Sequence, residues 1–232
     1  MPDANFAIAP WLGSPRASII VRFILDLPKP PGVAGASASA RAVGSTPWFS
    51  RKGFHLHTPG AEELSLRYFP DPALRKRARD LALIDSEVRR RARVMFEIMY
   101  EHAGIGLAAP QVGWSERLFV ANLSGSPEHP EQELVFVNPV LSDPQGEETI
   151  EEGCLSFRDL RVPVTRPAAI HVRATDLDGK VFELAANELL ARCIQHEVDH
   201  LDGILFIQRI STVEQLKIKR ALKELEKEYA RR

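Results

Sequence analysis

One segment near the C-terminal end combines a predicted helix with the residue spacing of a metal site. Asn187 is a typical N-cap, apolar residues follow at helical spacing, and the pattern ends near Gly203. Within it stands His-Glu-Val-Asp-His at positions 196–200. Histidines four residues apart lie on one face of a helix, where both imidazoles can bind one metal ion. Glu197 projects beside that site, where it can accept the proton of an attacking water.

A third ligand is needed, because catalytic sites of this kind take three protein ligands and leave one position open. In one large class of metalloproteases this ligand is a histidine, where Phe206 stands here. Cys154 is the better candidate, since a thiolate is a strong ligand for zinc or iron and Gly153 would let the backbone approach the metal. The rival is Cys193, which lies one turn before His196 on the same helix and would crowd that ligand. We expect Cys193 in the core or in the lining of a pocket, and no disulfide between the two cysteines.

The other elements are predicted from periodicity and turn signals. Helices are expected over about 86–104 and 211–225, and a hairpin turn at 176–179. Short runs rich in β-branched or aromatic residues predict strands at 118–120, 134–137 and 170–173. Because the strands form one block flanked by helices, rather than alternating with them, we predict an α+β domain.

Composition excludes several classes of protein. A chain of 232 residues that is 44% hydrophobic is long enough for one globular domain with extensions. Its net charge of −1 argues against binding to nucleic acid or to an acidic membrane surface. There is no apolar run of the length that a transmembrane helix needs, so no membrane association is expected.

Residues 1–60 differ from the rest. They are rich in Pro, Gly, Ala and Ser, and carry six Lys and Arg against two Asp. Such a composition buries too little apolar surface to offset chain entropy, so we expect a disordered N-terminal extension followed by a catalytic domain over 65–232. The same composition is typical of an organellar transit peptide. We therefore expect a bacterial cytoplasmic protein, or an organellar one if 1–60 is a transit peptide.

The first predicted helix carries a cluster of arginines: Arg89, Arg90, Arg91 and Arg93. Clusters of this kind usually form a solvated face, and we interpret this one in that way. A contact with the ribosome is the alternative.

Three segments together resemble the motifs of the peptide deformylase family. They are Gly-Ile-Gly-Leu-Ala-Ala-Pro-Gln-Val-Gly at 104–113, Glu-Gly-Cys-Leu-Ser at 152–156 and Gln-His-Glu-Val-Asp-His at 195–200. They occur in the family's order, and the similarity spans about Ser65 to Leu225. The resemblance implies an α+β fold in which antiparallel strands pack around a central metal-binding helix. It also implies hydrolysis of the N-formyl group from the formyl-methionine of nascent peptides, with release of formate.

The resemblance further implies the roles of individual residues. Cys154, His196 and His200 are the expected ligands of one divalent metal ion, and Glu197 is the expected general base and acid. Fe(II) is the expected native metal, with Zn(II) or another divalent ion as the alternative. Two groups of residues are expected to contact the substrate: Gln111 and Leu155 at the oxyanion, and Ile105 and Gly106 along the peptide backbone. The pocket for the methionine side chain is expected to be lined by Ile150, Leu189 and Cys193.

Two features depart from the family pattern. The segment 157–160 lacks the proline expected after Leu-Ser, and Arg192 stands near the pocket where many relatives are apolar. Neither belongs to the expected ligands, so both bear on substrate side-chain preference rather than on the chemistry. Arg161, close after the second motif, is either a solvent-facing strand residue or a substrate contact.

The metal-binding helix is compatible with two other functions. A general metallopeptidase would use the same helix, but Phe206 and Cys154 argue against it. A non-catalytic metal module would not need Glu197, and a structural site usually takes four protein ligands.

Overall fold

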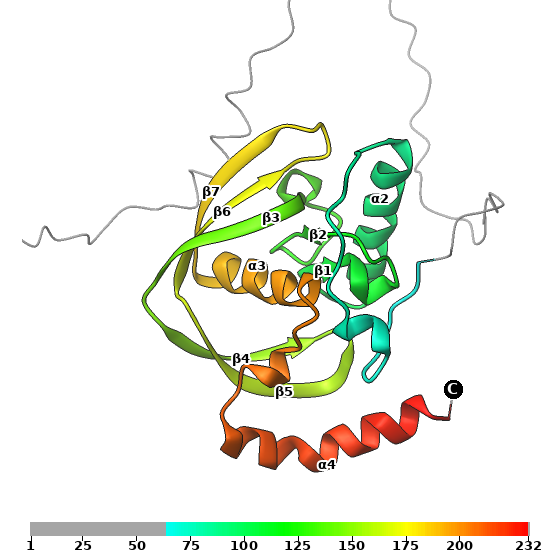
Figure 1. The fold of residues 1–232 in the computed structure, drawn as a ribbon, viewed down its shortest axis with the longest axis vertical. Coiled ribbons are helices and arrows are strands. Elements are labelled where there is room, and N and C mark those ends of the chain that lie inside the picture. The colour runs from blue at the N-terminus through cyan, green and yellow to red at the C-terminus, as the bar shows by residue number, and fades with distance from the viewer. Residues whose placement is uncertain (1–63, 232) are drawn as a thin grey trace, which may run out of the picture. The chain divides into compact units, whose positions relative to one another are not determined.

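The computed structural model describes residues 64–231, in which helices and antiparallel strands surround one central helix (Figure 1). The predicted α+β class is confirmed. The extension predicted over 1–60 lies outside the described residues, so its state and the domain boundary stay predictions.

The central helix is α3 (Glu188–Leu201), which carries the 196–200 segment. Asn187 occupies the predicted N-cap position in extended conformation, but its side chain makes no capping hydrogen bond. Buried residues occur on every side of α3 rather than along one stripe, which is the pattern of an interior helix. The two histidines are therefore presented inside the domain and not at its surface.

Two antiparallel sheets enclose α3. The larger has the strand order β1-β2-β3-β6-β7, and the smaller is a hairpin of β4 and β5. Figure 1 shows α3 between the long strands of the first sheet and the hairpin. The bounds are β1 (Gly106–Ala108), β2 (Leu118–Ala121), β3 (Leu134–Gln145), β4 (Glu148–Cys154), β5 (Phe157–Arg166), β6 (Ala169–Thr175) and β7 (Val181–Asn187).

The predicted strands 118–120, 134–137 and 170–173 are confirmed as parts of β2, β3 and β6, whereas β1, β4 and β5 were missed. The sequence of β4, Glu-Thr-Ile-Glu-Glu-Gly-Cys, is dominated by residues of low strand propensity. Pairing holds it extended all the same, from Glu148 opposite Arg166 to Gly153 opposite Arg161. The hairpin turn predicted at 176–179 joins β6 to β7, with Gly179 at φ 79°.

Helix α2 (Ser86–Glu101) begins as predicted, with the Asp85 carboxylate accepting from the Val88 backbone. At its end the Gly104 N–H donates to the Met99 carbonyl and the Ala103 N–H to that of Tyr100. This is the bond pattern of a Schellman motif. The left-handed residue in it is Ala103, at φ 52°.

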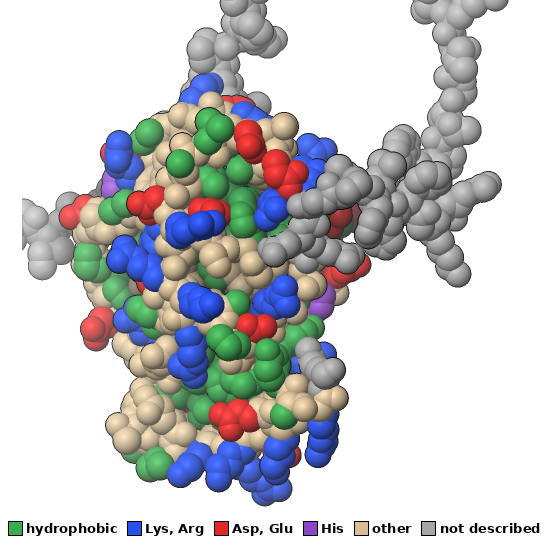
Figure 2. Space-filling view, turned by 45° about the vertical axis from the view of Figure 1, so that its right-hand side comes forward, with side chains coloured by type: hydrophobic (Ala, Val, Ile, Leu, Met, Phe, Trp, Pro, Cys, Tyr) green, Lys and Arg blue, Asp and Glu red, His purple; other side chains and the backbone are tan. Residues whose placement is uncertain are grey.

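Helix α4 (Thr212–Tyr229) begins at Ser211, whose hydroxyl accepts from the Glu214 backbone. Lys and Arg side chains gather along the lower edge of the surface in Figure 2, where α4 lies. None of the helices in the described part of the chain is long and apolar enough to cross a membrane. Short 3-10 helices complete the fold: η1 (Pro72–Arg75), η2 (Ala109–Val112), η3 (Pro130–Gln132) and η4 (Phe206–Gln208).

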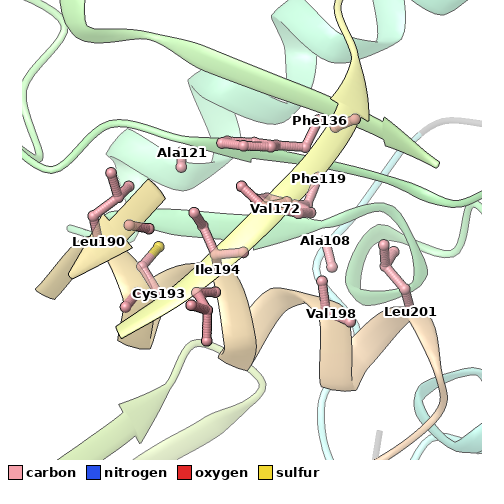
Figure 3. Packing of buried hydrophobic residues seen from close by; sticks show 14 of the residues in the cluster. Ala108, Phe119, Ala121, Phe136, Val172, Leu190, Cys193, Ile194, Val198 and Leu201 are labelled. Atoms are coloured by element: carbon pink, nitrogen blue, oxygen red, sulfur yellow. The ribbon is translucent and has the colours of Figure 1, made fainter. Parts of the chain in front are cut away.

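Buried apolar side chains hold α3 in place. Ile194 and Val198 pack in one cluster with Phe119, Phe136 and Val172 of the larger sheet (Figure 3). The rings of Phe119 and Phe136 stack with centroids 4.5 Å apart. A second cluster joins the β4–β5 hairpin to η4 and α4, and a third joins α2 to β1 and β2. Each large side chain buried in this way contributes about 1.5–3 kcal/mol, so α3 is a rigid support for the residues it carries.

Candidate metal centre and active site

Three side chains that can bind a metal converge where α3 meets the end of β4. The ligand atoms of Cys154, His196 and His200 all lie within 4.8 Å of one another. The Cys154 Sγ is 3.3 Å from the His200 Nε2, and the two imidazole rings lie one turn apart with centroids separated by 5.0 Å. One thiolate and two imidazoles are a donor set that fits a divalent zinc or iron ion with one position left open.

The choice between the two cysteines follows from their positions. Cys193 is buried, and its Sγ faces the Ile105 carbonyl at 3.7 Å rather than the histidines. Burial raises the pKa of its thiol well above the usual value. Both cysteines are free, so the expectation that no disulfide forms agrees with the structure. Cys154 is thus the thiol that can complete the group.

The role expected for Gly153 is not supported. A Cβ at this position would lie 3.5 Å from the Arg161 Cγ, an ordinary contact with the paired strand β5. Because side chains alternate along a strand, Gly153 faces away from Cys154. Arg161 itself is exposed, as in the solvent-facing interpretation.

Glu197 lies beside the three ligands and is 4% exposed. Its Oε2 atom has no hydrogen-bond partner among the described residues. Burial raises the pKa of Glu197 to about 7. A carboxyl group whose pKa is near neutrality can both accept and return a proton. The carboxylate fits because residue 106 is glycine: a Cβ there would lie 2.6 Å from the Glu197 Oε1.

Glu152 is a functional residue whose role sequence reasoning missed. Its Oε2 accepts from the Nδ1 of His196 at 3.0 Å, which leaves the Nε2 of that ring to face the site. Arg166 donates to both carboxylate oxygens of Glu152, at 2.7 and 3.0 Å. Although burial alone would raise it, the hydrogen bonds from His196 and Arg166 lower the pKa of Glu152 to about 2. Its place two residues before Cys154, on the same face of a strand, was the available signal.

Arg166 also forms an ion pair with α3. Arg166 donates to the Asp199 carboxylate at 2.7 Å, and Arg209 donates to it as well. Asp199 directly precedes His200, so this buried ion pair fixes the helix at the second histidine. Arg166 lies on β5, and no spacing in the sequence relates it to α3.

Gln111 is held with its amide toward the ligands. It lies in η2, where its Oε1 accepts from the Ala108 backbone at 2.8 Å. Its Nε2 donates to the Ser156 hydroxyl at 3.2 Å and lies 3.5 Å from the Cys154 Sγ. Leu155 lies in the turn between β4 and β5, directly after Cys154. The structure thus places both Gln111 and Leu155 next to Cys154.

The residues expected along the substrate backbone lie on an edge strand. In the described part of the chain β1 is the outermost strand of the larger sheet, and it pairs with β2 through Gly106 opposite Ala121. Ile105 precedes β1, and its carbonyl accepts from the Asn122 backbone at 2.9 Å. Gly106 lies against Glu197, so this edge passes close to the ligands.

The three residues expected in the side-chain pocket differ in exposure. Cys193 is buried, whereas Ile150 is 42% and Leu189 51% exposed. Ile150 lies on β4, on the same strand face as Cys154, and Leu189 lies one turn before Cys193 on α3. Arg192, expected near the pocket, is buried and directed toward the β4–β5 hairpin, where it donates to the Glu152 Oε1 at 2.6 Å.

Comparison with known proteins agrees with this geometry. The sequence profile of the family described as Polypeptide deformylase matches residues 64–216. The chain belongs to the peptide deformylase family. A peptide deformylase of Acidobacterium capsulatum is 45% identical over 159 residues, which are 68% of this chain and 93% of that protein. One of Chromobacterium violaceum is 44% identical over 165 residues, 71% of this chain and 97% of that protein.

Solved structures of peptide deformylases have the same fold. The enzyme of Plasmodium falciparum superimposes with a TM-score of 0.70 at 36% identity, covering 72% of this chain and 97% of its own. The enzyme of Synechococcus elongatus, solved with actinonin, gives 0.66 at 40% identity, covering 73% and 89%. As a peptide deformylase, the chain is a metal-dependent hydrolase that removes the formyl group from the N-terminal formyl-methionine of newly synthesised proteins and releases formate.

Proposed function

We propose that Cys154, His196 and His200 hold one divalent metal ion and that Glu197 is the catalytic base and acid of the deformylase. The observation that carries this assignment is the convergence of the three ligand atoms within 4.8 Å of one another, with Glu197 buried beside them. A bound ion would supply Lewis-acid chemistry, by polarising the formyl carbonyl and lowering the pKa of the attacking water.

The residues of the chain then handle the protons and the developing charge. Glu197 accepts the proton of the attacking water and returns it to the leaving amine of methionine, so that formate and a free N-terminus result. The oxyanion accepts hydrogen bonds from the Gln111 side-chain amide and the Leu155 backbone N–H. The bonds of Gln111 to Ala108 and Ser156 support this role, because they orient the amide before the substrate arrives.

For substrate binding, we propose that the peptide adds to the edge of β1 along Ile105 and Gly106. The open edge of β1 in the described part of the chain, close to Glu197, supports this placement. The methionine side chain enters a pocket lined by Ile150, Leu189 and Cys193, in which exposed and buried apolar residues adjoin.

We propose Fe(II) as the native metal, with Zn(II) or another divalent ion as the alternative, since a thiolate and two imidazoles suit either. A thiolate-ligated Fe(II) site is prone to oxidation, so activity is expected to decay in air. Purification without oxygen, followed by metal analysis and a formate-release assay on the same sample, tests this assignment. Stable activity of a zinc-loaded sample in air, with no iron found, would exclude it.

Three further expectations stay predictions. The N-terminal extension expected over 1–60 lies outside the described residues, and we propose a catalytic domain over 65–232 that works in the bacterial cytoplasm, or in an organelle if the extension is a transit peptide. A ribosome contact through the arginines of α2 is the least supported of these, because three of the four are paired with acidic side chains: Arg89 with Asp178, and Arg90 and Arg91 with Glu87.

The decisive experiment is the substitution Glu197→Ala. The variant is expected to keep its metal and to lose formate release from formyl-Met peptides, because the ligands remain and the base is gone. Unblocked peptides serve as the control substrate, since a general metallopeptidase would cleave them. Wild-type turnover in the variant, or cleavage of unblocked peptides by the wild type, would contradict the assignment.

A further inference from the structure

Arg192 is a buried guanidinium that contacts the hairpin at several points. Its Nη1 donates to the Glu152 Oε1 at 2.6 Å and to the Val164 carbonyl at 3.0 Å, and its Nη2 donates to the Glu148 carbonyl at 2.8 Å. The side chain therefore bonds to β4 and β5 at once, from a position on α3. Only 6% of the residue is exposed.

The acceptors of Arg192 lie on the strands that carry the thiol ligand. Cys154 is the last residue of β4, and Glu148 and Glu152 precede it on the same strand face. The two histidines, in contrast, are carried by α3. The geometry of the three ligands depends on how the hairpin is seated against the helix, and Arg192 is one of the side chains that bond across this junction.

Arg192 and His196 also share one acceptor group. They are four residues apart on α3, and both donate to the Glu152 carboxylate, Arg192 to Oε1 and His196 to Oε2. The carboxylate is thus bonded to α3 at two points one turn apart. Arg166 also bonds to both oxygens, from β5, so loss of the Arg192 bond leaves the carboxylate held by the hairpin and by His196 alone, and its position against α3 is less well fixed.

We propose that Arg192 is a positioning residue for the metal centre, which seats the β4–β5 hairpin on α3 so that Cys154 and His196 meet the ion in the correct geometry. This inference rests on the ligand assignment proposed above. Its physical basis is geometric rather than energetic, because a buried ion pair adds little net stability compared with well-packed apolar side chains.

The chain allows a test with few side effects on folding. In the Arg192→Met variant the volume of the side chain is kept, and Glu152 still has the two bonds from Arg166 to balance its charge. A matched control is Arg91→Met. Arg91 is a largely buried arginine that also donates to a glutamate, Glu87 at 2.8 Å, but both residues lie on α2.

The measurement uses Co(II) as the probe metal, added to protein from which the metal has been removed without oxygen. Its thiolate charge-transfer and d–d absorption bands report the geometry of the ligands, and competition with a chelator gives the affinity. We expect Arg192→Met to bind Co(II) about 10–100-fold more weakly and with altered bands, as for other residues that orient metal ligands. Arg91→Met is expected to keep the Co(II) affinity and bands of the wild type, because both members of its ion pair lie on α2.

The variant Arg192→Lys completes the test. Lysine keeps the charge but lacks the planar fork that reaches Glu152 and both carbonyls together, so its Co(II) affinity should lie between those of the wild type and Arg192→Met. Wild-type affinity and bands in Arg192→Met overturn the proposal. Should that variant not fold, the same result in Arg192→Lys overturns it. If the wild-type spectrum itself lacks a thiolate band, it is the ligand assignment that fails.

Discussion

The Nδ1 of His196 lies 3.0 Å from the Oε2 of Glu152, so the carboxylate determines which nitrogen of the ring faces Cys154 and His200. A metal-binding histidine whose second nitrogen is bonded to a carboxylate has its ring orientation and tautomer fixed. Here the carboxylate is itself held by Arg166, which also reaches Asp199 beside the second histidine. The three proposed metal ligands are therefore supported by a connected set of buried charges.

The first prediction concerns this carboxylate. In Glu152→Gln the shape of the side chain is kept while its charge is lost, so Arg192 loses the carboxylate that it contacts and Arg166 keeps only Asp199. Removing one member of a buried ion pair lowers the free energy of unfolding by about 3–5 kcal/mol. Metal affinity should fall about 10–100-fold, because the orientation of His196 is no longer fixed. Urea unfolding and competition with a chelator measure the two effects.

The control for Glu152 is Glu183→Gln. Glu183 forms an ion pair with Arg173 at 3.7 Å on the surface, with both side chains largely exposed. A surface pair contributes about 0–1 kcal/mol at most, so this variant should behave as the wild type in both measurements. Equal losses of metal affinity in the two variants would refute a specific role for Glu152.

The second prediction concerns the space beside the base. In Gly106→Ala the new Cβ would lie 2.6 Å from the Glu197 Oε1 and 2.8 Å from the Cys193 Sγ, so the carboxylate or β1 must move. A displacement of this size at a reacting group can lower kcat by about 100-fold. Metal content should be unchanged, since none of the three ligands is touched. Formate release and metal content, measured on the same sample, test this prediction.

The same substitution at Gly153 is the control for position 106. A Cβ there would make ordinary contacts, the nearest at 3.5 Å, and it faces away from the site. Gly153→Ala is expected to keep near wild-type kcat. If it proves as inactive as Gly106→Ala, steric exclusion at the base is not the explanation.

Gly106 and Gly153 show which features of the site can be predicted from the sequence and which cannot. The spacing of His196, Glu197 and His200 sufficed to predict a helix with a one-metal face, because helical periodicity alone relates residues four apart. The choice of Cys154 over Cys193 also followed from helix geometry, since a third ligand on the same helix would crowd His196 rather than approach the ion from another side. The sequence misjudged Gly153, because which face of a strand a residue occupies depends on a strand that was not predicted.

The ion network behind the site was beyond sequence reasoning for a similar reason. Arg166 and Asp199 are 33 positions apart, and Arg192 and Glu152 are 40 apart. Such pairs are fixed only when β4 and β5 are known to fold over α3. The strands themselves were missed because the Glu-rich sequence of β4 owes its extended form to pairing rather than to propensity.

The third prediction concerns the oxyanion. Gln111→Met removes a proposed donor while keeping the length of the side chain, and kcat should fall about 100–1,000-fold with metal content unchanged. Ser156→Ala removes only the hydroxyl that the Gln111 amide contacts at 3.2 Å, so a smaller loss of kcat, below about 10-fold, is expected. Steady-state kinetics on a formyl-Met peptide gives the kcat of each variant. A larger loss in Ser156→Ala than in Gln111→Met would reverse the proposed order of importance.

The fourth prediction concerns stability alone. Ala103 has a left-handed backbone at the end of α2, a conformation in which alanine is less stable than glycine by about 1–2 kcal/mol. Ala103→Gly should raise the free energy of unfolding by about 0.5–1 kcal/mol, after the entropy that glycine loses on folding. Within the same helix, Ala92→Gly should destabilise the protein, because a helix interior favours alanine. Calorimetry of both variants tests the sign, and a lower Tm for Ala103→Gly would contradict the prediction.

The last prediction is that metal binding stabilises the folded protein. Cys154 ends a strand of the hairpin and the two histidines lie on α3, so an ion bound by all three crosslinks elements that otherwise meet only through side chains. At a free metal concentration 1,000-fold above Kd, binding to the folded state alone adds about 4 kcal/mol to the free energy of unfolding. Removal of the metal should therefore lower the Tm, and Zn(II) or Co(II) should restore it. The double variant Cys154→Ser, His200→Ala should show no such response, and a metal-dependent rise in its Tm would place the ion elsewhere.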